Sequence, residues 1–161
     1  MTKSGWQKKL LLLTLPVIIM VLIVAMAKNN QSAYNGPLKG KSAVVYRSAS
    51  CGCCANYIKY LKKAGVLVDE KLAKDMPAIR KQFGVSDKLS SCHTTIIENY
   101  TVEGHIPIEA IQKLLTDKPN LAGIALPLMP AGSPGMPGRK IKAFNILGFS
   151  STGSSSPYLS L

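Results

Sequence analysis

The sequence predicts a small α/β domain, a central sheet of about four to five strands flanked by helices, behind an N-terminal signal or anchor helix. Two observations predict this class. Short apolar runs typical of strands alternate with segments of helical periodicity after residue 42. In front of them, a long uncharged stretch follows a few lysines. The chain of 161 residues is long enough for one such domain with additions at its ends.

The first 27 residues have the pattern of an export segment. Lys3, Lys8 and Lys9 precede an uncharged stretch, residues 10–27, which ends in the small-x-small sequence Ala25–Ala27. The stretch is long for a cleaved signal peptide and just long enough to span a bilayer, so signal and anchor both remain open. Either one places the rest of the chain outside the cytoplasm, in the periplasm or on the periplasmic face of the inner membrane. An uncleaved anchor would add membrane contact.

The predicted organisation is a signal or anchor over residues 1–27, a polar linker over 28–42, a domain over 43–150 and a flexible tail over 151–161. Within the domain, Asp75 and Pro77 mark the start of the second helix, and Pro107 marks the third. A loop rich in glycine and proline separates this third helix from the last strand. In order, the expected elements are a strand at 42–48, helix 53–64, strand 66–72, helix 77–83, a hairpin within 94–105, helix 107–118, loop 121–138 and strand 142–150.

The charge and the absent motifs exclude several classes of function. The formal net charge is +12, but the basic residues are spread singly or in pairs with little aromatic interleaving. We therefore predict no nucleic-acid partner and interpret the charge as a solvated surface. The sequence shows no convincing catalytic carboxylate pair, phosphate-binding loop or Ser/His/Asp arrangement, so no catalytic residue is assigned.

Three of the four cysteines crowd into the segment RSASCGCC, where the first strand turns into the first helix. Cys51 and Cys54 form a CxxC pair, and a CxxC at such a turn is typical of a thioredoxin-like fold. A helix N-terminus lowers thiol pKa values and so favours the thiolate. The additional Cys53 makes this segment poor disulfide architecture, since pairing with either neighbour closes a very tight ring. A soft-metal site, thiol redox chemistry and a purely structural disulfide all remain open.

Thiolates are soft ligands that suit Cu(I), and they can bridge metal ions. A dense cysteine cluster therefore favours a multinuclear Cu(I) site over a single structural zinc, which needs two separated ligand pairs. In a thioredoxin-like fold the start of the third strand faces the CxxC turn, which would bring Cys92 to the cluster. His93 occupies the place of the usual cis-proline, and this counts against an oxidoreductase. The alternative is a buried free Cys92 beside a surface histidine.

Three further side chains are candidates to bind metal or to support its ligands. His105 stands at a strand end before Pro107, where a capping or exposed histidine is the alternative. Met129 and Met136 offer thioether sulfur from a loop that could lie over the cysteines. The alternative for both methionines is packing beneath that loop.

Four separated motifs resemble the CopG-like copper-resistance proteins, a metal-binding family known as a domain of unknown function. They are YRSASCGCC, SCHTTIIENYTVEGHIP, IQKLL and GIALPLMPAGSPGMPG, within residues 43–149. The resemblance implies a thioredoxin-like fold, export to the periplasm and a Cu(I) cluster with redox chemistry. It implicates Cys51, Cys53, Cys54 and Cys92 as ligands, and His93, His105, Met129 and Met136 also lie in the motifs. The serine-rich tail departs from the family pattern.

The leading hypothesis is an exported copper-binding protein for copper resistance. It would sequester Cu(I), exchange it with other envelope copper-handling proteins, or interconvert Cu(I) and Cu(II). The alternative is an envelope thiol-disulfide oxidoreductase that uses Cys51 and Cys54, with Cys53 or Cys92 as the resolving thiol. Enzymatic activity is therefore left open. A third hypothesis is a structural module stapled by disulfides.

Overall fold

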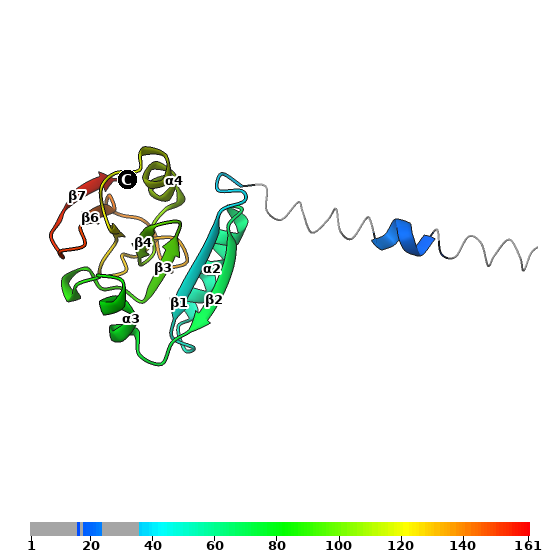
Figure 1. Cartoon of the computed structure of the whole chain (residues 1–161), viewed down its shortest axis with the longest axis horizontal. Helices are drawn as coiled ribbons and strands as arrows, with labels where there is room; N and C mark the ends of the chain where they lie inside the picture. Colours follow the sequence, from blue (N-terminus) through cyan, green and yellow to red (C-terminus); the bar gives the residue numbers. More distant parts are fainter. Residues whose placement is uncertain (1–15, 17, 24–35) are drawn as a thin grey trace, which may run out of the picture. The chain divides into compact units, whose positions relative to one another are not determined.

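The computed structural model describes Pro16, residues 18–23 and residues 36–161 (Figure 1). Pro16 and residues 18–23 are helical. Among these described residues, no helix combines the length and the apolarity needed to cross a membrane. Most of the predicted signal or anchor, and the start of the predicted linker, lie outside the described residues, so those assignments stay predictions.

The domain is built on one seven-stranded sheet with the order β2-β1-β3-β4-β5-β6-β7. The predicted α/β class is confirmed, with more strands than the four to five expected. The elements are β1 (Ser42–Arg47), α2 (Gly52–Lys63), β2 (Leu67–Leu72), α3 (Met76–Gln82), a 3-10 turn (Asp87–Leu89), β3 (His93–Ile97), β4 (Tyr100–Glu103), α4 (Ile108–Asp117), β5 (Gly123–Ala125), β6 (Asn145–Phe149) and β7 (Ser155–Ser160).

The two strands that were not among the predicted elements, β5 and β7, lack the alternation of apolar and polar residues that indicates a strand. β5 is only three residues long, and it lies in the stretch predicted as a loop. β7 (Ser155–Ser160) falls in the serine-rich tail, which was predicted to be flexible with Tyr158 and Leu159 as a candidate edge pairing. This strand pairs antiparallel with β6, and backbone hydrogen bonds join Phe144 and Leu161 in both directions. Backbone pairing with β6 and the packing of Tyr158, Leu159 and Leu161 on the main core together order the tail.

The helices begin and end at residues suited to their ends. The Cys54 N–H donates to Cys51 Sγ at the N-terminus of α2, and Gly65 follows the helix with a φ of 94°. Asp75 caps α3 as predicted, accepting from the Ala78 N–H at 3.0 Å. In Figure 1, α2 lies against β1 and β2. Tyr57, Ile58 and Leu61 of α2 are buried in the main core with residues of α4 and the central strands.

The strand order brings the site together. β1 is parallel to β2 through the α2 crossover, and β3 runs antiparallel to β1. Arg47, the last residue of β1, pairs with His93, the first residue of β3. The segment that follows β1 therefore lies beside the segment that precedes β3. Both segments carry cysteines.

Candidate metal centre

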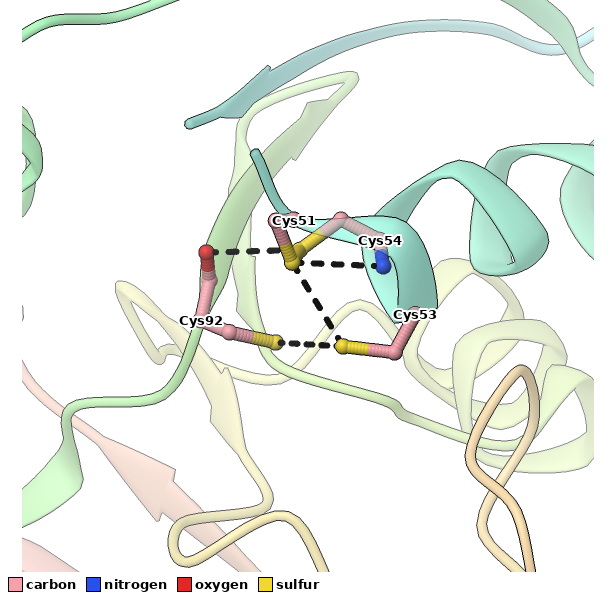
Figure 2. A group of neighbouring side chains, drawn as sticks. All are labelled: Cys51, Cys53, Cys54 and Cys92. Atoms are coloured by element: carbon pink, nitrogen blue, oxygen red, sulfur yellow. Dashed lines mark hydrogen bonds between the residues drawn. A yellow bond between two sulfur atoms is a disulfide. The ribbon is translucent and has the colours of Figure 1, made fainter. Parts of the chain in front are cut away.

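The four cysteines meet at the first turn of α2 (Figure 2). Cys51 and Cys54 are joined in a disulfide, and Cys53 and Cys92 are free. Cys53 Sγ lies 3.4 Å from Cys51 Sγ and 4.0 Å from Cys92 Sγ. All four sulfurs lie within 4.8 Å of one another. The predicted proximity of Cys92 to the CxxC turn is thus confirmed.

Cys92 also joins a second group of ligand atoms, with His93 and His105. Its sulfur lies 2.9 Å from His105 Nε2 and 3.5 Å from His93 Nδ1. Both histidines are fully buried, so the surface position considered for His93 and the exposed position considered for His105 are wrong. Their rings contact each other edge-on at 4.8 Å between centroids, and both contact Tyr57.

The orientation of His105 is fixed by the loop that follows β5. Its Nδ1 lies 2.6 Å from the carbonyl oxygen of Pro134, which can only accept a hydrogen bond. The hydrogen of the neutral ring therefore sits on Nδ1, and Nε2 presents a lone pair toward Cys92 Sγ. This is the arrangement in which a second hydrogen bond orients a metal-binding histidine.

Burial controls the protonation of this site. Burial, and then the adjacent His105, lower the pKa of His93 to about 3. Burial likewise lowers the pKa of His105. Burial, and then the neighbouring Cys53, raise the pKa of Cys92 to about 12. At neutral pH the metal-free site therefore holds neutral imidazoles and a protonated Cys92, and a metal ion would displace the thiol proton on binding.

One buried atom of the site lacks a partner. His93 Nε2 makes no hydrogen bond within the described part of the chain, although the residue is fully buried. A buried polar nitrogen normally finds a partner. The other ring nitrogen of His93, Nδ1, is the one that faces Cys92 Sγ, at 3.5 Å.

The loop predicted to lie over the cysteines does contact them. A Cβ added at Gly135 would lie 2.7 Å from the Tyr57 backbone nitrogen and 3.0 Å from the Cys53 carbonyl oxygen. Only glycine fits this close approach, which also has a φ of 84°. Met136 is half-buried next to it, and Met129 is 38% exposed farther back in the loop. A ligand role for either methionine stays a prediction.

Gly135→Ala tests the packing of this loop. We expect a loss of about 1–3 kcal/mol in the free energy of unfolding, from the left-handed backbone and the clash with α2. Gly153→Ala is the matched control, because Gly153 has the same φ of 84° and no atom within 4 Å of the added Cβ. Urea unfolding of both variants measures the difference. Equal losses would contradict a loop held tightly against the cysteine turn.

Two residues near the candidate metal centre, Glu103 and Tyr57, were not predicted from the sequence to contribute to it. Glu103 is fully buried on β4 and accepts from the Ser91 N–H at 2.7 Å and the Thr94 hydroxyl at 2.6 Å. It thereby holds the segment on both sides of Cys92 and His93. Tyr57, which the helical pattern marked only as apolar, donates to the Ile106 carbonyl oxygen at 2.9 Å. An acidic residue inside a short strand was the one available signal for Glu103.

The family of this chain follows from its similarity to known proteins. A family described as "Protein of unknown function, DUF411" matches residues 89–136. Two solved structures, forms 1 and 2 of a copper resistance protein CopG, are each 38% identical to this chain. They cover 74% and 75% of it and 96% and 98% of their own chains, with TM-scores of 0.69 and 0.70. The chain belongs to the CopG family. No curated protein matches it.

The family model covers part of what the sequence motifs indicated. The DUF411 segment contains Cys92, His93 and His105, together with the loop through Met136. Cys51, Cys53 and Cys54 lie outside that segment. In this CopG-family chain the sheet therefore joins two stretches that carry candidate ligands, and the cysteine cluster is compatible with metal binding.

Proposed function

We propose that this protein is an exported copper-binding protein that holds Cu(I) as a multinuclear cluster and serves copper resistance. The observation that carries the proposal is the convergence of four cysteine sulfurs within 4.8 Å. Copper is the cargo of this site. The names of the two similar structures support copper as the metal, and the ligand chemistry supports Cu(I), because thiolates are soft ligands.

The cluster requires the reduced protein. Opening the Cys51–Cys54 disulfide takes two electrons and two protons and yields two thiols. The chain then offers four thiols in one small space. A thiolate can bridge two metal ions, so four of them can hold more than one Cu(I). Storage, transfer to another envelope copper protein and cycling between Cu(I) and Cu(II) are all compatible with this chemistry.

His105 and His93 complete the proposed site on the Cys92 side. His105 offers the lone pair of Nε2, and its Nδ1–H is held by Pro134. His93 is also fully buried, and its Nδ1 lies 3.5 Å from Cys92 Sγ, which supports a role in metal binding. Met129 and Met136 are proposed as additional soft donors at the edge, because they belong to the loop that packs on the cysteine turn.

Export to the periplasm and a thioredoxin-like origin are parts of the same proposal. The apolar segment behind Lys3, Lys8 and Lys9 supports export. The parallel β1-α2-β2 unit, the antiparallel β3 and β4, and a CxxC pair between β1 and α2 support a thioredoxin-like relationship. The backbone has no cis peptide bond among the described residues, so the cis-proline of thiol oxidoreductases is absent there.

A second candidate function rests on the disulfide itself. Cys51 is half-buried, so the thiolate of an external dithiol could attack Cys51 Sγ, form a mixed disulfide and release Cys54 as the leaving thiolate. This favours an envelope thiol-disulfide oxidoreductase. A disulfide-exchange assay with a small dithiol substrate tests it, and turnover no faster than that of Cys51→Ser would exclude it.

The test of the main proposal is an anaerobic titration of the reduced full chain with Cu(I). We expect more than one copper ion per chain, and a lower stoichiometry in Cys53→Ser, which removes the sulfur between Cys51 and Cys92. Ser50→Ala is the matched control, because it changes an exposed neighbour outside the ligand set. Copper binding that is unchanged by Cys53→Ser would contradict the proposal.

A further inference from the structure

We propose that the loop after β5 (residues 126–143) docks the folded domain on an anionic lipid membrane. Its exposed apolar side chains enter the lipid interface, and its cations contact the phosphate head groups. This contact belongs to the domain itself and is separate from the predicted N-terminal signal or anchor. It goes beyond the proposed copper function and does not rest on it.

The two most exposed large apolar side chains of the described part of the chain both lie in this loop. Leu128 is 89% exposed and Ile141 is 84% exposed. Met129, next to Leu128, is 38% exposed. A single exposed apolar side chain is ordinary on a protein surface, but two side chains of this exposure on one loop indicate a contact with an apolar partner.

Three cations surround Ile141 in the sequence RKIK. Arg139, Lys140 and Lys142 are all exposed, and within the described residues none of them forms an ion pair. Residues 118–161 contain no Asp or Glu that could neutralise them. Apolar side chains set among basic ones are typical of a segment that lies in the interface of an anionic membrane.

The loop is compact, so these side chains belong to one small surface. The Gly132 N–H donates to the Pro137 carbonyl oxygen at 3.0 Å. A Cβ added at Gly132 would lie 2.3 Å from the Lys140 backbone nitrogen, so the two halves of the loop pack together. Leu128 lies four residues before Gly132. Ile141 directly follows Lys140, so chain length alone keeps the Cα atoms of Leu128 and Ile141 within about 25 Å.

The loop is also fixed to the domain before any partner arrives. The Pro134 carbonyl oxygen accepts from His105 Nδ1 at 2.6 Å, and Gly135 packs on the first turn of α2. Leu128 and Met129 both have left-handed backbones, with φ values of 65° and 46°. Strain of this kind persists where the surroundings hold it and is common at binding sites. A loop that is already ordered loses little freedom when it docks.

A lipid bilayer matches both kinds of side chain at once. It offers an anionic surface with an apolar layer directly beneath it, so cations and apolar side chains on the same loop find partners together. An acidic protein would attract the cations as well, but it would also need an apolar pocket for Ile141 among its acidic residues. The bilayer needs no such matching pocket, and we therefore favour it.

The test uses the piece Tyr34–Leu161, because the predicted N-terminal segment would bind lipid by itself. This piece is a compact unit of the chain. The two CopG structures match over 96% and 98% of their own lengths and cover 74% and 75% of this chain, so such domains fold without a counterpart of the rest.

Sedimentation with vesicles of phosphatidylcholine and about one-third phosphatidylglycerol measures the binding. Vesicles of phosphatidylcholine alone are the comparison. We expect reversible binding to the anionic vesicles and at least about tenfold weaker binding to the neutral ones. Raising the salt concentration should weaken the binding to the anionic vesicles, because salt screens the attraction between the cations and the head groups.

Charge variants show whether the loop is the contact. Replacing its three cations with glutamine should weaken binding to the anionic vesicles by at least about tenfold. The loop variant carries Arg139→Gln, Lys140→Gln and Lys142→Gln. The matched control removes the same charge from exposed positions of α2 and should bind within about threefold of the unchanged piece. This control carries Lys59→Gln, Lys62→Gln and Lys63→Gln.

An apolar variant tests entry into the lipid. Ile141→Ser should weaken the binding by about five- to tenfold, because the side chain no longer leaves water when the loop docks. Leu72→Ser is the matched control, since Leu72 is 62% exposed on β2, outside the loop. Urea unfolding of each variant shows that it keeps its fold.

Three results would overturn the proposal. No binding to anionic vesicles would exclude the membrane and leave the loop as a surface for an acidic protein. Equal losses in the loop and α2 charge variants would show that only the overall charge attracts the lipid. Binding that is the same in Ile141→Ser and in the unchanged piece would show that no apolar side chain enters the interface.

Discussion

Cys92→Ser is expected to lower the affinity of the reduced protein for Cu(I) by at least about 100-fold, since changes to residues that merely support ligands already cost 10–100-fold. Cys92 is the cysteine shared by both groups of converging ligand atoms. Its sulfur lies 4.0 Å from Cys53 Sγ and 2.9 Å from His105 Nε2. A hydroxyl oxygen is a hard ligand that does not replace a thiolate for Cu(I).

Competition against a Cu(I) chelator measures this loss, and unfolding of the metal-free protein shows whether the variant keeps its fold. Ser90→Ala is the matched control, because it removes a hydroxyl two residues away and leaves the sulfur in place. If the affinity of Cys92→Ser for Cu(I) stays within a few-fold of that of the unchanged chain, the cysteines at the start of α2 bind copper without Cys92. The central place given to Cys92 would then be wrong.

Glu103→Leu is expected to lower the free energy of unfolding by about 2–5 kcal/mol, since a buried donor left without its acceptor costs about 1–3 kcal/mol. The carboxylate accepts from the Ser91 N–H and from the Thr94 hydroxyl, and leucine accepts from neither. Glu103→Gln retains one acceptor oxygen and should lose much less. Urea unfolding of the copper-free protein measures both. Equal losses in the two variants would contradict a hydrogen-bonding role.

The same residue predicts a pH dependence. Burial raises the pKa of Glu103 from 4.5 to about 7 in the folded chain. Between these values the folded chain keeps a proton that the unfolded chain has released, so this residue's contribution to stability falls as the pH rises. The total change is about 3 kcal/mol at most. The histidines titrate in both proteins, so the difference between Glu103→Gln and the unchanged chain isolates the carboxyl group.

We therefore expect the free energy of unfolding of Glu103→Gln to rise relative to that of the unchanged chain between pH 5 and pH 8. Each unit by which the folded pKa of Glu103 exceeds its unfolded value contributes about 1.4 kcal/mol to this rise. Urea unfolding at several pH values, with copper removed, provides the comparison. A constant difference across this range would show that Glu103 ionises as it would in water.

Helix periodicity and helix capping could be predicted from the sequence because both depend on residues close together in the chain. The α2 stripe through Tyr57, Ile58 and Leu61 follows helical periodicity, and Asp75 caps α3 through a neighbouring N–H. The family motifs placed Cys51, Cys53, Cys54 and Cys92 among the candidate ligands before their positions were known. The local pattern of the tail left its strand undecided, because the order of β7 depends on pairing with β6.

The residue pattern was enough to predict the α/β class, the cysteine-rich turn before α2 and the candidate donors on both sides of β3. How those donors divide into groups depends on the tertiary structure. In the folded chain Cys51 is bonded to Cys54, and Cys92 lies between Cys53 and His105. Glu103 accepts a hydrogen bond from the Ser91 N–H, next to Cys92. The approach of Cys53 to Cys92 joins residues 39 apart in the sequence. It depends on the register of β1 against β3, which the local pattern of either strand does not specify.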